Sequence, residues 1–373
     1  MTGPLCESVV NPDAQPGYGA VLLKQLEHNH LLINALDEKH EWFRYHPLFS
    51  DFLRQVEAEV NPGEIPKLHK RAAIWLEENN YLAEAFGHAL VCRDMKWAAD
   101  LIERNALPMI NLGEVSALAR SISKLPDEIT RRRPSLMVAY AWSLIVTNKS
   151  DVARFWLDEL RLLIGKHENL ATTATILDHP ESAGEPERIN WPIIRGGLAL
   201  CESHLAMASG DMKHAAELSQ RASSFFQEVE QYSSSTYFRS IVALDESISS
   251  ILSGDTQKAI GSLRTTIRIA RQANNQYAMI AAGCALADMQ ALQGQLSKAW
   301  ETYQRVQFWS QGQGGKPLPL SGLVDVGLGE ILLEHDLLEE ANDYLERGLQ
   351  ITQSMWYFGS LHGMIALTRL RQA

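Results

Sequence analysis

The chain has 373 residues, more than one compact domain usually holds, so its length indicates two domains or an extended array of repeats. Hydrophobic residues make up 46% and charged residues 21%, which excludes a disordered or collagen-like chain. The net charge of −11 disfavours binding to a nucleic-acid backbone. The sequence has no run of about 18 apolar residues, no signal-like start and no CxxC spacing. We therefore expect a cytoplasmic protein with free thiols and no membrane contact.

The first 60 residues predict a helix followed by a β-hairpin. A helical pattern covers residues 19–28, and two apolar-rich runs, 31–36 and 41–45, flank a short charged turn. This arrangement resembles a helix and the wing of a winged-helix domain. Four basic against nine acidic residues make such a wing a poor reader of DNA. The predicted core residues of this segment are Phe43, Leu48, Phe49 and Phe52.

From about residue 64 onward the pattern is helical and contains a recurring triple. Each triple is a small residue, a turn residue seven positions later and an alanine five positions after that. The small residue lets two antiparallel helices approach, the turn residue accepts a left-handed helix end, and the alanine receives the returning helix. The triples are Ala73/Asn80/Ala85, Ala141/Asn148/Ala153, Ser203/Gly210/Ala215, Ser247/Gly254/Ala259, Ala287/Gly294/Ala299 and Gly329/Asp336/Ala341.

Two intervals between triples are too long for one repeat. The first has room for an additional helix pair at residues 94–105 and 114–124, and the second contains a stretch with Gly165, Pro180, Ser182 and Pro186. We therefore divide the chain into a partial winged helix at 1–60, helical repeats at 61–165, an exposed insertion or linker at 166–190, and further repeats at 191–373.

The string HEWFRYHPLFSDFLRQ (residues 40–55) resembles the end of the winged helix in the large ATP-dependent LuxR-type transcriptional regulators, of which the maltose-regulon activator is a member. The resemblance continues through HKRAAIWLEENNYLAEAFGHALVCRDMKWAADLI and the repeats. It implies an all-α fold, a tetratricopeptide-like right-handed helical superhelix with a small N-terminal winged-helix remnant.

Two parts that the family implies have no counterpart in this sequence. No string fits the phosphate-binding motif GxxxxGK[ST]; the nearest, residues 312–317, lacks its first glycine and has Pro317 in place of the hydroxyl residue. No basic helix-turn-helix is present either. We expect a fragment without a cofactor, with ATP implied only for a missing N-terminal domain, and without direct nucleic-acid contact.

Candidate ligand residues come from the first helix of each repeat. By resemblance, these helices line the concave groove, and the position after the small residue points into it. A buried charge is costly unless it is paired, so polar residues here either line a wet groove or pair with each other. The predicted ligand-binding residues are Arg195, His204, Arg239, Asp245, Asp288 and Glu330.

Catalytic and metal sites are not predicted. His40, Glu41 and His46 form HExxxxH rather than HExxH and lie in a predicted strand, and no serine has a nucleophile motif. The aromatic residues at helical spacing are interpreted as interhelical core: Trp142, Phe155, Trp156, Trp300, Tyr303 and Trp309.

These observations predict an effector-sensing, non-enzymatic fragment of an ATP-dependent transcriptional activator. Its partner would be a small-molecule inducer or a regulatory protein, and self-association is possible. The alternative is a stand-alone tetratricopeptide-type adaptor that holds a protein in its groove. A hydrolase built on helical repeats would need a metal or nucleophile constellation that the sequence lacks.

Overall fold

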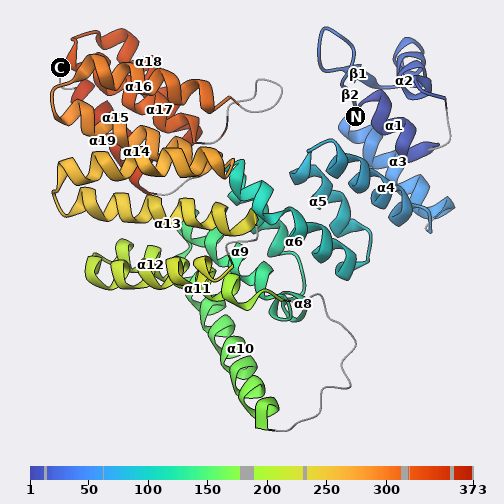
Figure 1. Ribbon diagram of the computed structural model, residues 1–373. Coiled ribbons are helices and arrows are strands. Elements are labelled where there is room, and N and C mark those ends of the chain that lie inside the picture. Colours follow the sequence, from blue (N-terminus) through green and yellow to red (C-terminus); the bar gives the residue numbers. More distant parts are fainter. Residues whose placement is uncertain are drawn as a thin grey trace. The chain divides into compact units, whose positions relative to one another are not determined.

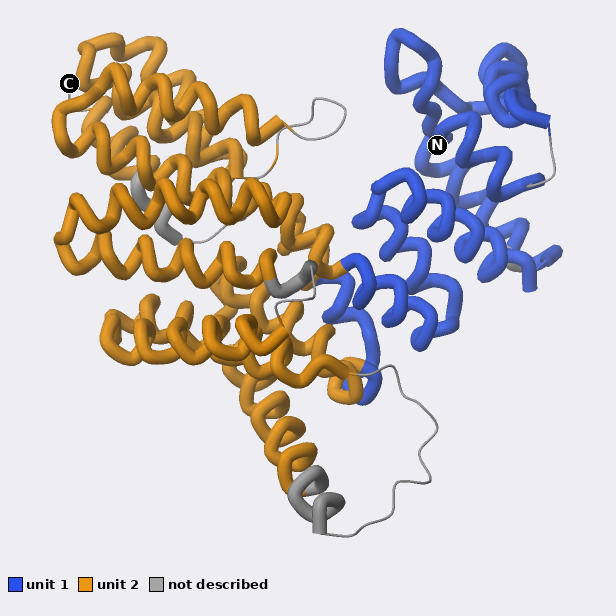
Figure 2. The backbone as a smooth tube through the Cα atoms, viewed as in Figure 1, with its two compact units in different colours: residues 1–105, 120–129 blue, residues 106–119, 130–373 orange. Residues whose placement is uncertain are grey.

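The protein is described here by a computed structural model, which covers residues 1–11, 15–61, 63–176, 189–229, 233–311, 318, 320–352 and 357–371. These residues form nineteen α-helices and one two-stranded sheet (Figure 1). They divide into two compact units, coloured separately in Figure 2: unit 1 holds residues 1–105 and 120–129, and unit 2 holds residues 106–119 and 130–373. Within the described part, no helix is long and apolar enough to cross a membrane.

The N-terminal segment confirms the predicted helix and hairpin. Helix α2 (Tyr18–His28) precedes strands β1 (Ile33–Ala35) and β2 (Phe43–Tyr45), which pair antiparallel with Ile33 opposite Tyr45. Helix α1 (Gly3–Val10) was not predicted from the sequence; it has Pro4 in its first turn, where a missing N–H costs nothing.

The predicted core of this segment is wrong for two of its four residues. Phe43 is buried and Phe49 half-buried, but Leu48 and Phe52 of α3 (Pro47–Val60) are 75% and 55% exposed. The space beside Phe43 is already filled by Cys6, Leu23 and Ile33, which come from α1, α2 and β1. The unforeseen helix α1 therefore occupies the place that α3 was expected to take.

The helices that follow confirm the first repeat and the additional helix pair. They are α4 (Ile65–Glu78), α5 (Leu82–Val91), α6 (Met95–Asn111), α7 (Val115–Ile122) and α8 (Asp127–Arg131). Helix α6 continues past its predicted end to Asn111, with Pro108 inside it.

Two histidines face each other between α4 and α5. His69 and His88 bring their Nδ1 atoms to 3.0 Å, and both are partly buried. Desolvation, helped by the neighbouring His69 and by Arg54, lowers the pKa of His88 from 6.5 to about 4. The folded state therefore favours neutral imidazoles at this contact.

Unit 2 is a stack of antiparallel helix pairs that follow one another from green to red in Figure 1. Its helices are α9 (Pro134–Val146), α10 (Ser150–Ile176), α11 (Trp191–Ala208), α12 (Met212–Gln227), α13 (Ser233–Leu252), α14 (Thr256–Gln272), α15 (Gln276–Leu292), α16 (Leu296–Trp309), α17 (Ser321–Glu334), α18 (Leu338–Thr352) and α19 (Tyr357–Leu370).

All six predicted turn residues adopt the left-handed conformation. Their φ angles are 62° at Asn80, 58° at Asn148, 83° at Gly210, 78° at Gly254, 73° at Gly294 and 61° at Asp336. At two turns the next residue starts the returning helix: the Asp211 and Asp255 side chains accept hydrogen bonds from the backbone N–H groups of His214 and Lys258. The small residue and the alanine of every triple are buried, which confirms the predicted close approach.

Part of the proposed insertion at 166–190 is helical, because α10 extends to Ile176. Residues 177–188 lie outside the described residues, as do residues 312–317, the string nearest to a phosphate loop.

The aromatic predictions hold for three of the six residues. Trp142, Trp156 and Tyr303 are buried, whereas Trp300 and Trp309 are half-buried. Phe155 is 47% exposed, because its neighbour Trp156 faces the core and Phe155 covers the Arg131 guanidinium instead.

Asn111 forms a hydrogen-bonded clasp within unit 2. Its Oδ1 accepts from the backbone N–H of Gln276 at 2.6 Å, and its Nδ2 donates to the carbonyl of Asn274 at 2.9 Å. The end of α6 is thereby fixed to the turn between α14 and α15.

Ala259→Trp should lower the free energy of unfolding by roughly 1–3 kcal/mol, because Ala259 is fully buried where α14 packs against its partner helix. Urea denaturation followed by circular dichroism measures the effect. Gln257→Trp, at an exposed position of the same helix, serves as the control and should stay within about 0.5 kcal/mol of the wild type. Equal stability of the two variants would contradict the packing.

Acidification should destabilise the chain through His88. Because its folded pKa lies below the ordinary 6.5, its contribution is complete above pH 6.5 and is lost as the pH falls toward about 4. His88→Leu should reduce this acid sensitivity by roughly 1–2 kcal/mol, allowing for solvent screening of a partly exposed group. Urea midpoints at pH 7.5 and 4.5 test this, with the exposed His214→Leu as control. An identical pH dependence in wild type and His88→Leu would refute it.

Candidate functional site

The six predicted ligand residues all lie on first helices of the repeats. Arg195 and His204 belong to α11, Arg239 and Asp245 to α13, Asp288 to α15 and Glu330 to α17. The structure joins two of them, His204 and Asp245, in a direct contact. The other four lie elsewhere along these helices and are half-buried: Arg195, Arg239, Asp288 and Glu330.

His204 and Asp245 form a buried pair between α11 and α13. The His204 Nδ1 and Asp245 Oδ2 atoms are 3.1 Å apart, and the two side chains are 4% and 1% exposed. Desolvation raises the pKa of the Asp245 carboxyl, against the opposing pull of His204 and Ser203. His204 is therefore the main group that offsets the cost of burying the Asp245 carboxylate inside the protein.

Aromatic side chains from the neighbouring repeats surround this pair. The Trp142 ring on α9 meets the His204 ring edge-on at 4.7 Å and the Tyr277 ring on α15 at 6.3 Å. Tyr237 on α13 is also buried, and Tyr277 contributes to the raised pKa of its hydroxyl, although desolvation is the main cause. We call these five residues the inner cluster: Trp142, His204, Tyr237, Asp245 and Tyr277. It joins α9, α11, α13 and α15, the first helices of four successive pairs.

Three polar atoms of the inner cluster are buried without a hydrogen-bond partner in the described part of the chain. They are the indole Nε1 of Trp142, the hydroxyl of Tyr237 and the Oδ1 of Asp245. Buried polar groups are almost always paired in native proteins, so each needs an explanation. The indole and the hydroxyl can each donate a hydrogen bond to a group that enters the cluster, and the Asp245 Oδ1 can accept one.

Trp142 was predicted to be interhelical core, and Tyr237 and Tyr277 were not predicted to belong to any site. A signal for all three exists. Trp142 follows the small residue Ala141, as His204 follows Ser203, and each tyrosine lies ten residues before the small residue of its own repeat. Four of the five cluster members therefore occupy one of two recurring repeat positions, and Asp245 is the exception.

The remaining predicted residues have other partners. Arg195 forms an ion pair with Glu168 of α10 at 2.9 Å, and Asp288 accepts a hydrogen bond from the Tyr303 hydroxyl of α16. Burial, with Asp288 beside it, raises the pKa of Tyr303 well above its ordinary value. Asp288 thus ties a first helix to its own second helix.

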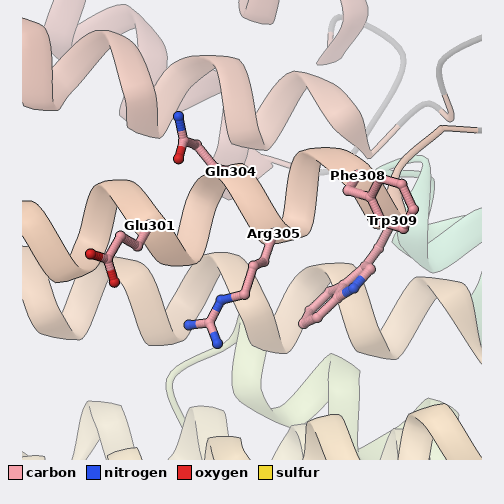
Figure 3. Close-up of a pocket in the computed structure, with 5 residues that line it drawn as sticks. All are labelled: Glu301, Gln304, Arg305, Phe308 and Trp309. Carbon is pink, nitrogen blue, oxygen red and sulfur yellow. The ribbon is translucent and has the colours of Figure 1, made fainter.

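A shallow depression lies on the second helix α16, and none of the six predicted residues lines it. Figure 3 shows its lining, Glu301, Gln304, Arg305, Phe308 and Trp309.

Among the described residues, no group of three or more His, Cys, Asp or Glu side chains is arranged to hold a metal ion. His40 contacts Glu27 at 3.1 Å, from the loop of the hairpin.

His204→Ala should lower the free energy of unfolding by about 3–5 kcal/mol, because it leaves the Asp245 carboxyl buried without its partner. Adding Asp245→Asn should recover part of this loss, since the amide carries no charge to desolvate. Urea denaturation of both single variants and the double variant gives the coupling energy. His214→Ala, at an exposed histidine of α12, is the control. Additive effects of the two changes would contradict a coupled pair.

Comparisons with known proteins match both ends of the chain. A family model described as the MalT winged helix domain matches residues 1–65, and one described as the MalT-like TPR region matches residues 196–373. The HTH-type transcriptional regulator MalT of Klebsiella pneumoniae is 24% identical over 334 residues, which are 89% of this chain and 34% of that protein. MalT of Yersinia enterocolitica matches to the same extent.

Two further matches extend the comparison. The serine/threonine-protein kinase PknK of Mycobacterium tuberculosis is 31% identical over 150 residues, 40% of this chain and 14% of the kinase. The crystal structure of a signal transduction ATPase with numerous domains and a tetratricopeptide repeat sensor, from Pyrococcus horikoshii, shares the fold. Its TM-score is 0.50 at 13% identity, covering 95% of this chain and 48% of that one.

This chain thus spans about a third or less of the length of the curated relatives named here. The chain is therefore similar to MalT in two regions: residues 1–65 match its winged helix domain and residues 196–373 match the MalT-like tetratricopeptide region.

Proposed function

We propose that this chain is the effector-sensing part of an ATP-dependent transcriptional activator in the cytoplasm. The family matches support a regulator with a winged helix and a tetratricopeptide-like sensor region. The observation that carries the proposal is the inner cluster, because it joins four successive repeats through polar and aromatic groups. A small-molecule inducer or a regulatory protein acts by changing how these repeats pack.

The inner cluster suits an effector that presents hydrogen-bond acceptors. The indole N–H of Trp142 and the Tyr237 hydroxyl can each donate one bond, and the aromatic faces supply contact area. Both donors are buried between the repeats, so an effector can accept these bonds only when the repeats pack in a way that leaves room for it. Differential affinity for two arrangements is what lets a ligand shift an equilibrium.

The four other predicted residues belong to the same first helices and extend the proposed site beyond the cluster. Arg195, Arg239, Asp288 and Glu330 offer charged groups of both signs. A sugar, a small alcohol or a peptide fits such a mixture. ATP and DNA binding are assigned to regions of a longer regulator that carry a phosphate loop and a basic helix-turn-helix, because this sequence matches neither motif. Catalysis forms no part of this function.

A protein-binding adaptor is the alternative function. The depression on α16 favours it, since this feature lies on an outer, second helix and carries an exposed Phe308. The two functions differ in where binding is lost on substitution. An effector sensor loses binding through the inner cluster, and an adaptor loses it through the exposed side chains of the array.

Tyr237→Phe should weaken effector binding about tenfold without lowering the stability of the free chain. The hydroxyl forms no hydrogen bond with the described residues, so its removal costs no internal bond, whereas a bound effector loses one acceptor contact. Thermal-shift screening of the purified chain against oligosaccharides, polyols and short peptides identifies a binder. Calorimetric titration then compares the wild type, Tyr237→Phe and Trp142→Phe.

Tyr81→Phe is the matched control, because Tyr81 is exposed and lies in unit 1. It should bind with wild-type affinity. If both cluster variants bind as the wild type does, the effector site lies elsewhere and the adaptor function is favoured.

A further inference from the structure

The outer side of α14 and α16 carries a concentration of positive charge. Helix α14 contains Lys258, Arg264, Arg268 and Arg271 and no acidic residue, in a chain with a net charge of −11. Helix α16 adds Arg305 beside two aromatic residues. We define the basic outer surface by six residues: Arg264, Arg268, Arg271, Arg305, Phe308 and Trp309.

Packing joins the two helices into one surface. The Arg271 guanidinium lies over the Trp309 ring at 5.4 Å, and Trp309 also packs beside Gly283 of α15, where a larger residue would crowd it. Figure 3 shows Arg305 and Trp309 projecting from the same side of α16. Phe308 is 74% exposed and offers an apolar contact next to the charges.

Arg264 and Arg268 do not serve to hold the array together. Arg264 and Arg268 are exposed and form no ion pair with the described residues, whereas Arg131 and Arg347 of the same unit pair with Glu159 and Asp325. Clustered like charges destabilise a fold slightly unless a partner neutralises them. The charge of this surface is therefore available to a partner.

The spacing of the arginines matches a helix. Arg264, Arg268 and Arg271 lie four and three residues apart, which places them on one face of α14, about 6 Å and about 4.5 Å apart along its axis. On a helix of a partner protein, carboxylates at positions i, i+4 and i+7 have the same spacings along the axis. An apolar residue on that helix would meet Phe308.

We propose that the basic outer surface docks an acidic helical segment of a partner protein, with carboxylates on the three arginines of α14 and an apolar side chain on Phe308. A short protein segment is favoured over a nucleic acid, because the net charge of −11 repels an extended polyanion that reaches beyond the three arginines, and the exposed Phe308 offers an apolar contact. This surface uses none of the inner cluster, so it is independent of the effector site.

Fluorescence anisotropy with the whole chain tests the docking surface. The probe is a labelled helical peptide with glutamates at i, i+4 and i+7 and one leucine, and the comparison probe has the same composition in scrambled order. The ordered peptide should bind more tightly than the scrambled one, and its affinity should fall as salt is raised. The triple variant Arg264→Glu/Arg268→Glu/Arg271→Glu should weaken binding at least tenfold, and Phe308→Ala should weaken it several-fold.

The matched control is Arg154→Glu/Lys213→Glu/Arg221→Glu, which makes the same change in charge at exposed positions of α10 and α12. It should bind the ordered peptide within about twofold of the wild type. Circular dichroism melts of every variant confirm that the array is folded. An equal loss in the control, equal binding of the two peptides, or no binding at all would overturn the proposal. Tighter binding of a single-stranded oligonucleotide, lost in the α14 variant, would overturn it in favour of a nucleic-acid surface.

Discussion

The close approach of paired helices at small residues is the constraint on which the array depends. A small residue on the first helix and an alanine on the second let the two backbones come together, and a left-handed turn residue reverses the chain between them. Each pair then has an apolar face that only the next pair can cover. The stack follows from this packing, because no single pair could bury its own core.

This packing gives the two kinds of helix different chemistry. First helices are enclosed on almost every side; α9, for example, is buried along nearly its whole length. A polar group there must find a partner inside the protein: Asp288 finds it on its own second helix, and His204 and Asp245 find each other across two repeats. Second helices keep an exposed face, so free charges such as those of α14 can accumulate there without desolvation. The proposed effector site and the proposed docking surface therefore lie on different helices.

The sequence predicted the features that depend on local backbone geometry. Gly210, Asn148 and Asp336 are of residue types that tolerate the positive φ angles of the left-handed region. The turns could therefore be located in advance. His204 and Asp245 were assigned to one site, but their direct contact depends on the rotation between successive repeats, which no local pattern encodes. Trp142 and Tyr277 joined the cluster for the same reason. The burial of Leu48 and Phe52 was wrongly predicted because α1, whose apolar pattern is short, competes for the same core.

The clasp made by Asn111 has a consequence for how the array folds. In a simple repeat protein each repeat contacts only its neighbours, so unfolding can begin at either end and proceed stepwise. Asn111 instead bonds to residues more than 160 positions further along the chain. This contact forms only after the helices between them have been assembled, and it must break before they separate. Such long-range closure slows folding and makes the intervening repeats unfold together rather than fray one at a time.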